Sequence, residues 1–160
     1  MATNEESMTK LALFQKQQNI FRIAKAFWFS VEQDWHQQLK DFDLTINEYM
    51  ILVVLFEENH LTISEIAAQG FMHISTAMNL CRRMAQKELL FLEKNEHDKR
   101  ITVVELKEKG RKLVEQVHQE LDFSEAVIEK STKKIEHMIG IQPTFNDLRS
   151  VIRDVYGKKF

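Results

Sequence analysis

The sequence predicts a mainly α-helical fold that contains one small β-hairpin. Only 4 of the 160 residues are glycine and 1 is proline, so the chain has few obligate turns. A hydrophobic content of 44% is ordinary for one globular domain with a core. Apolar residues recur at helical spacing over most of the chain, whereas residues typical of strands concentrate in two short segments, 89–94 and 101–106.

The first long helix is expected from about residue 8 to residue 40. Aromatic residues recur every seven positions along it, at Phe14, Phe21, Trp28 and Trp35, and Phe42 continues the series. A repeat of seven indicates a packing seam. Two interpretations remain open, because the seam either covers the core of its own domain or meets a second subunit. The second is favoured for part of the seam, since a helix rising about 1.5 Å per residue outruns a small domain.

Two capping boxes predict the next two helices. Residues 45–48 open a strongly apolar helix that runs to about Phe56, and we expect this helix to be central and buried. Residues 62–65 open a short helix that ends at Gly70, and a very short strand at 61–62 precedes it.

A tight turn at 71–73 joins this short helix to a second one over 74–87, and such a pair forms a helix-turn-helix unit. On a helical wheel, one side of the second helix is apolar and carries Ile74, Ala77, Cys81, Met84 and Ala85. The opposite side carries Ser75, Asn79, Arg82 and Gln86, with Thr76 and Arg83 at its edge. Hydroxyl, amide and guanidinium groups bind base edges and phosphates in the major groove of DNA. The alternative is the solvated polar face of an ordinary amphipathic helix.

The two predicted strands enclose a polar tip at 95–100, which would form a wing beside the helix-turn-helix unit. Its basic residues are Lys94, His97, Lys99 and Arg100. A basic hairpin tip can contact phosphates or enter the minor groove. The alternative is a turn that serves only solubility.

The net charge of −2 argues weakly against nucleic-acid binding, but charge is unevenly distributed. Segment 71–100 holds six basic and four acidic residues, 6 − 4 = +2, which leaves −4 for the rest. We expect no signal peptide and no membrane span, because no long apolar run occurs. One cysteine fits a reducing cytoplasm and allows no internal disulfide.

From residue 108 the chain is predicted to be helical again, with an interruption near Ser131 and Thr132, a break at 140–143 and a last helix over 144–156. The six histidines have no tight metal-ligand spacing, and Cys81 is expected to be structural rather than a redox switch. No phosphate-binding glycine loop or nucleophile turn occurs. We therefore expect no metal, no cofactor and no enzymatic activity.

The wing and the helix that follows it resemble the MarR family of transcription regulators. Asp98, Lys99 and Arg100 are followed by Leu106 and Gly110 at the spacing of the family pattern D-x-R-(x5)-L-T-x-x-G. Two departures stand out: Lys107 replaces a helix-capping Thr, and Glu88 replaces a Gly that commonly follows the recognition helix. Segments 26–39, 47–48 and 72–79 are similar to a subgroup of the family that controls extracellular protease production and sporulation in bacilli.

The resemblance implies a winged helix-turn-helix lobe at about 45–107, within one domain spanning 1–160. Helices at about 8–42 and 108–160 would form a homodimer, and a pseudo-palindromic operator would follow from its symmetry. The resemblance places Ser75, Thr76, Asn79, Arg82 and Arg83 in the major groove, and Lys99 and Arg100 on the wing, with Arg100 held by Asp98. The expected function is that of a cytoplasmic DNA-binding regulator, in the simplest case a repressor.

Two other functions remain open. The winged fold can serve as a protein-interaction module without DNA, or as a sensor that an effector releases from DNA. Family members often bind small aromatic effectors between the dimer helices and the DNA-binding lobe. Phe27, Trp28, Trp35 and Tyr49 could line such a pocket, although core packing is the favoured explanation for them.

Overall fold

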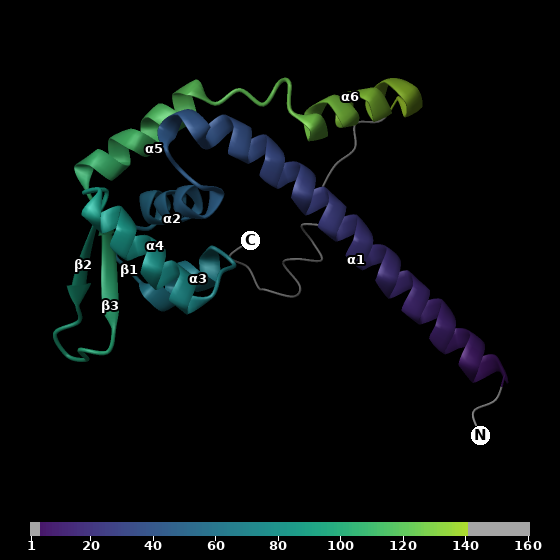
Figure 1. Cartoon of the computed structure of the whole chain (residues 1–160), viewed down its shortest axis with the longest axis horizontal. Helices are drawn as coiled ribbons and strands as arrows, with labels where there is room; N and C mark the ends of the chain where they lie inside the picture. The colour runs from purple at the N-terminus through teal and green to yellow at the C-terminus, as the bar shows by residue number, and fades with distance from the viewer. Residues whose placement is uncertain (1–3, 141–160) are drawn as a thin grey trace. The chain divides into compact units, whose positions relative to one another are not determined.

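The computed structural model describes residues 4–140, which form helices and a small antiparallel sheet (Figure 1). In chain order the elements are α1 (Asn4–Leu39), the 3-10 turn η1 (Lys40–Phe42), α2 (Ile46–Glu57), β1 (Leu61–Thr62), α3 (Ile63–Gln69), α4 (Ile74–Gln86), β2 (Leu90–Lys94), β3 (Thr102–Leu106), α5 (Glu108–Glu120) and α6 (Val127–Ile139). The helix expected over 144–156 lies outside the described residues. The predicted mainly helical fold with a hairpin wing is confirmed.

The chain divides into two compact units, and residues 32–122 form the unit that contains the helix-turn-helix. Its core centres on α2, whose side chains are largely buried, as its continuous apolar sequence predicts. Both expected capping boxes are present, with Thr45 and Glu48 opening α2 and Thr62 and Glu65 opening α3. Within this unit α2 packs against α3, α4 and α5 (Figure 1).

Three strands form an antiparallel sheet in the order β1-β3-β2. Strand β3 is central, pairing Leu61 with Val104 on one side and Leu90 with Leu106 on the other. The β2–β3 pairing extends to Lys94 and Thr102, and the hairpin tip projects beyond it (Figure 1). The short strand expected at 61–62 therefore closes the base of the wing.

The aromatic seam of α1 divides between two environments. Near the end of α1, Trp35 packs against the core and Leu39 is fully buried. Earlier in the helix, Phe14, Phe21 and Trp28 are all at least half exposed. The end of the seam thus covers its own core, as one interpretation held, whereas the earlier part has no such cover within the described residues.

One predicted helix break is wrong. Helix α6 runs through Ser131 and Thr132 without interruption. The Thr132 hydroxyl donates to the Ile128 carbonyl at 2.9 Å within the same helix, so it has a partner that is compatible with a helical backbone. The break between α5 and α6 lies at residues 121–126 instead.

The two departures from the family pattern have different outcomes. Glu88 adopts the left-handed conformation, with φ of 63°, at which glycine is favoured. Its amide donates to the Ala85 carbonyl and that of Leu89 to the Met84 carbonyl, both at 3.0 Å, so the turn after α4 forms despite the side chain. At the start of α5, Lys107 occupies the N-cap position and supplies no side-chain capping bond.

Candidate DNA-binding surface

Helix α4 is held in place by small and flexible apolar side chains. Ala77, Cys81 and Met84 on its inner side are fully buried. Burial raises the pKa of the Cys81 thiol to about 12, so the thiolate is not formed near neutral pH. This environment supports the structural role expected for Cys81.

The outward side of α4 carries the polar residues that the sequence singled out. Ser75, Asn79 and Arg82 are exposed, and Thr76 is partly buried. These four side chains come from the first three turns of one helix, on the side away from the buried residues. The structure thus brings together hydrogen-bonding groups able to pair with base edges and phosphates.

Arg83 is engaged within the protein. Its Nε and Nη2 atoms lie 3.2 and 3.0 Å from Oε1 of Glu48, at the start of α2. The Glu48 side chain is only 3% exposed and that of Arg83 is 52% exposed. The other carboxylate oxygen, Oε2, accepts from the amide and hydroxyl of Thr45 at 2.9 and 2.8 Å. One carboxylate therefore both caps α2 and holds α4 against it.

The hydrogen bonds around Glu48 determine its charge. Burial would raise the pKa of Glu48, but the hydrogen bonds from Thr45 and Arg83 outweigh burial and lower it. Glu48 is thus ionised at neutral pH and attracts the Arg83 guanidinium. Sequence reasoning recognised Glu48 only as a capping residue, because its partner lies 35 positions away.

The position of Ile74 corrects the helical-wheel prediction. The wheel grouped Ile74 with the buried side of α4, but its side chain is 57% exposed. Ile74 is the first residue of the helix, so no preceding helical turn lies beneath its side chain. Phe71, three residues earlier in the turn, is also exposed.

The wing tip is ordered by its own side chains. Asn95 Oδ1 accepts hydrogen bonds from the amides of His97 and Asp98 at 2.9 and 3.1 Å. Asp98 in turn accepts from the Arg100 amide and Nε at 3.0 Å, and from Nη2 at 2.9 Å. Lys99 stands between them and is exposed.

The structure therefore contains the hydrogen bonds from Arg100 to Asp98 by which Asp98 could hold the Arg100 side chain. Arg100 lowers the pKa of Asp98, and Asp98 raises that of Arg100, through hydrogen bonds. The Arg100 side chain is 90% exposed, and a guanidinium has five N–H donors. Asp98 accepts from only two of its nitrogens, which leaves donors able to reach a phosphate or a base.

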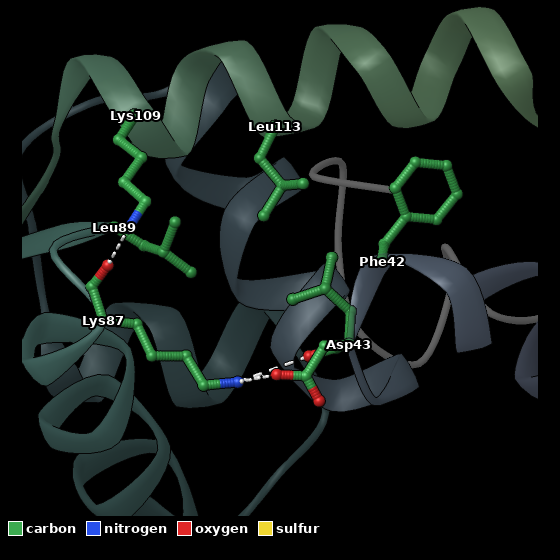
Figure 2. A pocket seen from close by; sticks show the side chains of 7 residues that line it. Phe42, Asp43, Lys87, Leu89, Lys109 and Leu113 are labelled. Atoms are coloured by element: carbon green, nitrogen blue, oxygen red, sulfur yellow. Dashed lines mark hydrogen bonds and ion pairs between the residues drawn. The ribbon is translucent and has the colours of Figure 1, made fainter.

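A pocket of about 330 Å³ lies beneath the start of α5, away from the outward side of α4. Figure 2 shows that its two lysines already have partners. Lys87 Nζ lies 2.8 Å from Asp43 Oδ2, and Lys109 Nζ donates to the Lys87 carbonyl at 2.9 Å. These bonds connect the C-terminal end of α4 to η1 and α5. The helix dipole is negative at this end of α4, so it also stabilises the nearby lysine cations.

The four aromatic residues that could line an effector pocket, for which core packing was the favoured explanation, divide between the two units. Tyr49 is buried, and the Trp35 ring packs on it at 5.1 Å between centroids, so these two residues serve the core. Phe27 and Trp28 belong to the other unit and are exposed.

Among the described residues, no three His, Cys, Asp or Glu side chains are grouped as a metal ion would need. The same part of the chain holds no helix long and apolar enough to cross a membrane.

Comparison with known proteins identifies the class. A family model described as "Transcriptional regulator SarA/Rot" matches residues 35–117. The HTH-type transcriptional regulator Hpr of Geobacillus sp. (strain WCH70) is 34% identical over 160 residues, covering 100% of this chain and 80% of Hpr. The DNA-binding transcriptional repressor ScoC of Bacillus subtilis (strain 168) is 36% identical over 143 residues, covering 89% of this chain and 70% of ScoC.

Solved structures agree on the fold. A Cys-to-Ser mutant of MarR from E. coli, complexed with operator DNA, has a TM-score of 0.70 at 18% identity and covers 89% of this chain and 97% of its own. The S. aureus MepR–DNA complex has a TM-score of 0.53 at 26% identity, and the match covers 76% of this chain and 97% of the MepR chain.

The fold and the matches together define a winged helix-turn-helix protein of the transcription-regulator class. The chain belongs to the SarA/Rot transcriptional regulators of the MarR-like group, and it is similar along its whole length to Hpr. The expected family and the expected Hpr-like subgroup are thus confirmed. Because this family consists of regulators, the prediction that the chain is not an enzyme is confirmed as well.

Proposed function

We propose that this chain binds duplex DNA sequence-specifically as a homodimer and represses transcription by occupying promoters. The observation that carries the proposal is the pairing of an exposed polar side on α4 with an ordered basic wing tip. Ser75, Asn79 and Arg82 would supply base contacts, and Thr76, Lys99 and Arg100 would hold the DNA backbone. Arg83 is left to position α4, since Glu48 already binds it.

Dimerisation is supported by the early part of α1. Between Leu11 and Phe29 this helix exposes many large apolar side chains, and a helix that exposes so much apolar surface normally buries it against a partner. The exposed set is Leu11, Leu13, Phe14, Ile20, Phe21, Ile23, Phe27, Trp28 and Phe29. A second copy of the chain presents the same face, which favours a symmetric dimer and a palindromic DNA site.

The relatives indicate which genes to test. ScoC of Bacillus subtilis is a DNA-binding transcriptional repressor by name, and this chain shares 36% of its residues over the matched region. Because the chain also resembles the subgroup that controls extracellular protease production and sporulation in bacilli, we propose these genes as the target class. A regulator of chromosomal genes would act in the cytoplasm.

A salt titration of DNA binding tests the proposal. Each phosphate contact contributes about 0.9 to the slope of log K against log salt, so a steep slope is expected for the wild type. Arg100→Ala should weaken binding by about 1–3 kcal/mol and reduce the slope. Lys107→Ala is a matched control, because it removes an exposed cation at the end of β3 opposite to the wing tip, and it should leave both values near those of the wild type. Absence of binding at low salt would instead favour an interaction module without DNA.

A further inference from the structure

The entry end of α4 exposes large apolar side chains. In the unit formed by residues 32–122, the exposed large hydrophobic residues are Phe71, Ile74, Phe91 and Ile101. Two of these four lie at the turn into α4 or on its first residue. An isolated exposed apolar residue is ordinary, but a β-branched residue at an exposed helix position is disfavoured relative to alanine.

The direction of the Ile74 side chain follows from helix geometry. In an α-helix the Cα–Cβ bond tilts toward the N-terminus, so the first residue directs its side chain off the end of the helix. On the wheel Ile74 borders the side that carries Ser75 and Arg82, both exposed. An apolar group therefore lies at the edge of the side that carries polar groups suited to reading bases.

The major groove presents one apolar feature, the C5-methyl group of thymine, and the N-terminal residues of a recognition helix contact base edges there. We propose that Ile74 is a specificity-determining residue that contacts a thymine methyl group in each half-site. The proposal rests on the proposed function, since it assumes that α4 enters the major groove. Ile74 then selects thymine over cytosine at that position, while its polar neighbours read adjacent bases.

Deoxyuridine provides a direct test, because it lacks only the methyl group of thymine and keeps its hydrogen-bonding edge. Thymines in both half-sites of a selected operator are replaced symmetrically, one position at a time, and Kd is measured at fixed salt. At one position, loss of the methyl should weaken wild-type binding about fourfold per half-site, the factor expected for one buried methyl-sized group. Ile74→Ala should weaken binding to the thymine duplex similarly.

Combining the deoxyuridine replacement with Ile74→Ala shows whether Ile74 is the residue that contacts the methyl group. In Ile74→Ala, deoxyuridine at that position should have no further effect, because the contact is already absent. Ile101→Ala is the matched control: Ile101 is another exposed isoleucine, which directly follows the wing tip and lies outside α4, and its loss should leave the deoxyuridine effect unchanged. Ile74→Val, which keeps the β-branch, should retain part of the thymine preference.

The possible outcomes distinguish failure of the thymine-methyl contact from failure of the proposed DNA binding. If the wild type binds a selected duplex but every deoxyuridine effect is equal in wild type and Ile74→Ala, the methyl contact is refuted and DNA binding stands. A preferred half-site without thymine also refutes it. If the wild type binds no duplex at low salt, both proposals fail.

Discussion

The ion pair between Arg83 and Glu48 gives the sharpest prediction about stability. In Arg83→Ala, Oε1 of Glu48 loses the two Arg83 nitrogens that lie 3.2 and 3.0 Å from it, while it remains in a side chain that is 3% exposed. Removing one partner of a fully buried pair costs about 3–5 kcal/mol. Because Arg83 is half exposed, water replaces part of the lost interaction, and we expect a cost of about 2 kcal/mol, within the range for hydrogen bonds to charged groups.

Equilibrium unfolding in urea measures this cost, with all variants at one protein concentration because a dimer's stability depends on it. Arg82→Ala is the matched control, since it removes an exposed arginine from the adjacent position of the same helix. It should change the free energy of unfolding by less than about 0.5 kcal/mol. Equal, small losses in the two variants would refute the assignment of Arg83 as the residue that holds α4.

The two arginines should behave in the opposite way toward DNA. Arg82→Ala is expected to weaken the sequence preference, because Arg82 is proposed to contact bases, whereas Arg83→Ala should leave both the preference and the salt slope near their wild-type values under conditions in which the variant is folded. A loss of slope in Arg83→Ala as large as that in Arg100→Ala would mean that Arg83 contacts phosphate directly.

The pH dependence of the pair has a definite sign. The pKa of Glu48 is lowered in the folded protein, so its stabilising contribution is present above the ordinary value of 4.5 and is lost as pH falls through the lower folded pKa. The stability difference between wild type and Arg83→Ala should therefore shrink in acid. A difference that stays constant between neutral pH and pH values well below 4.5 would contradict the role of the ionised carboxylate.

Two further substitutions test the departures from the family pattern. Glu88→Gly should stabilise the protein by about 1 kcal/mol in urea unfolding, because it relieves a left-handed residue with φ of 63°, and an unchanged or lower midpoint would contradict this. Lys107→Thr should add about 1 kcal/mol by capping α5, which has no side-chain cap, whereas Lys107→Ala should not.

Local sequence signals predicted the elements of the DNA-binding lobe well. The capping boxes at Thr45 and Thr62 act over three residues, so the sequence displays them directly. The buried α2 and the hairpin likewise follow from short-range patterns. The hydrogen bonds at Asn95 and those between Asp98 and Arg100 are also local, and the resemblance drew attention to Asp98 and Arg100.

The features that the sequence did not reveal depend on tertiary context. Arg83 sits at the edge of the polar side on a helical wheel, and nothing near it in sequence reveals the carboxylate on α2 that binds it. Ile74 has the spacing of a core residue, but a wheel assumes a complete turn on both sides, which the first residue of a helix lacks. Glu88 shows the converse, since backbone hydrogen bonds and the burial of Leu89 preserve a turn that its own residue type disfavours.

Selection of preferred duplexes from a random pool tests the central claim most directly. A dimer of winged helices should recover an inverted repeat whose half-site centres lie about one helical turn, roughly 10 base pairs, apart. Binding to that repeat should fall steeply with salt and should weaken in Arg100→Ala. Recovery of no preferred sequence, or of a single unrepeated site bound equally well by wild type and Arg100→Ala, would contradict the account.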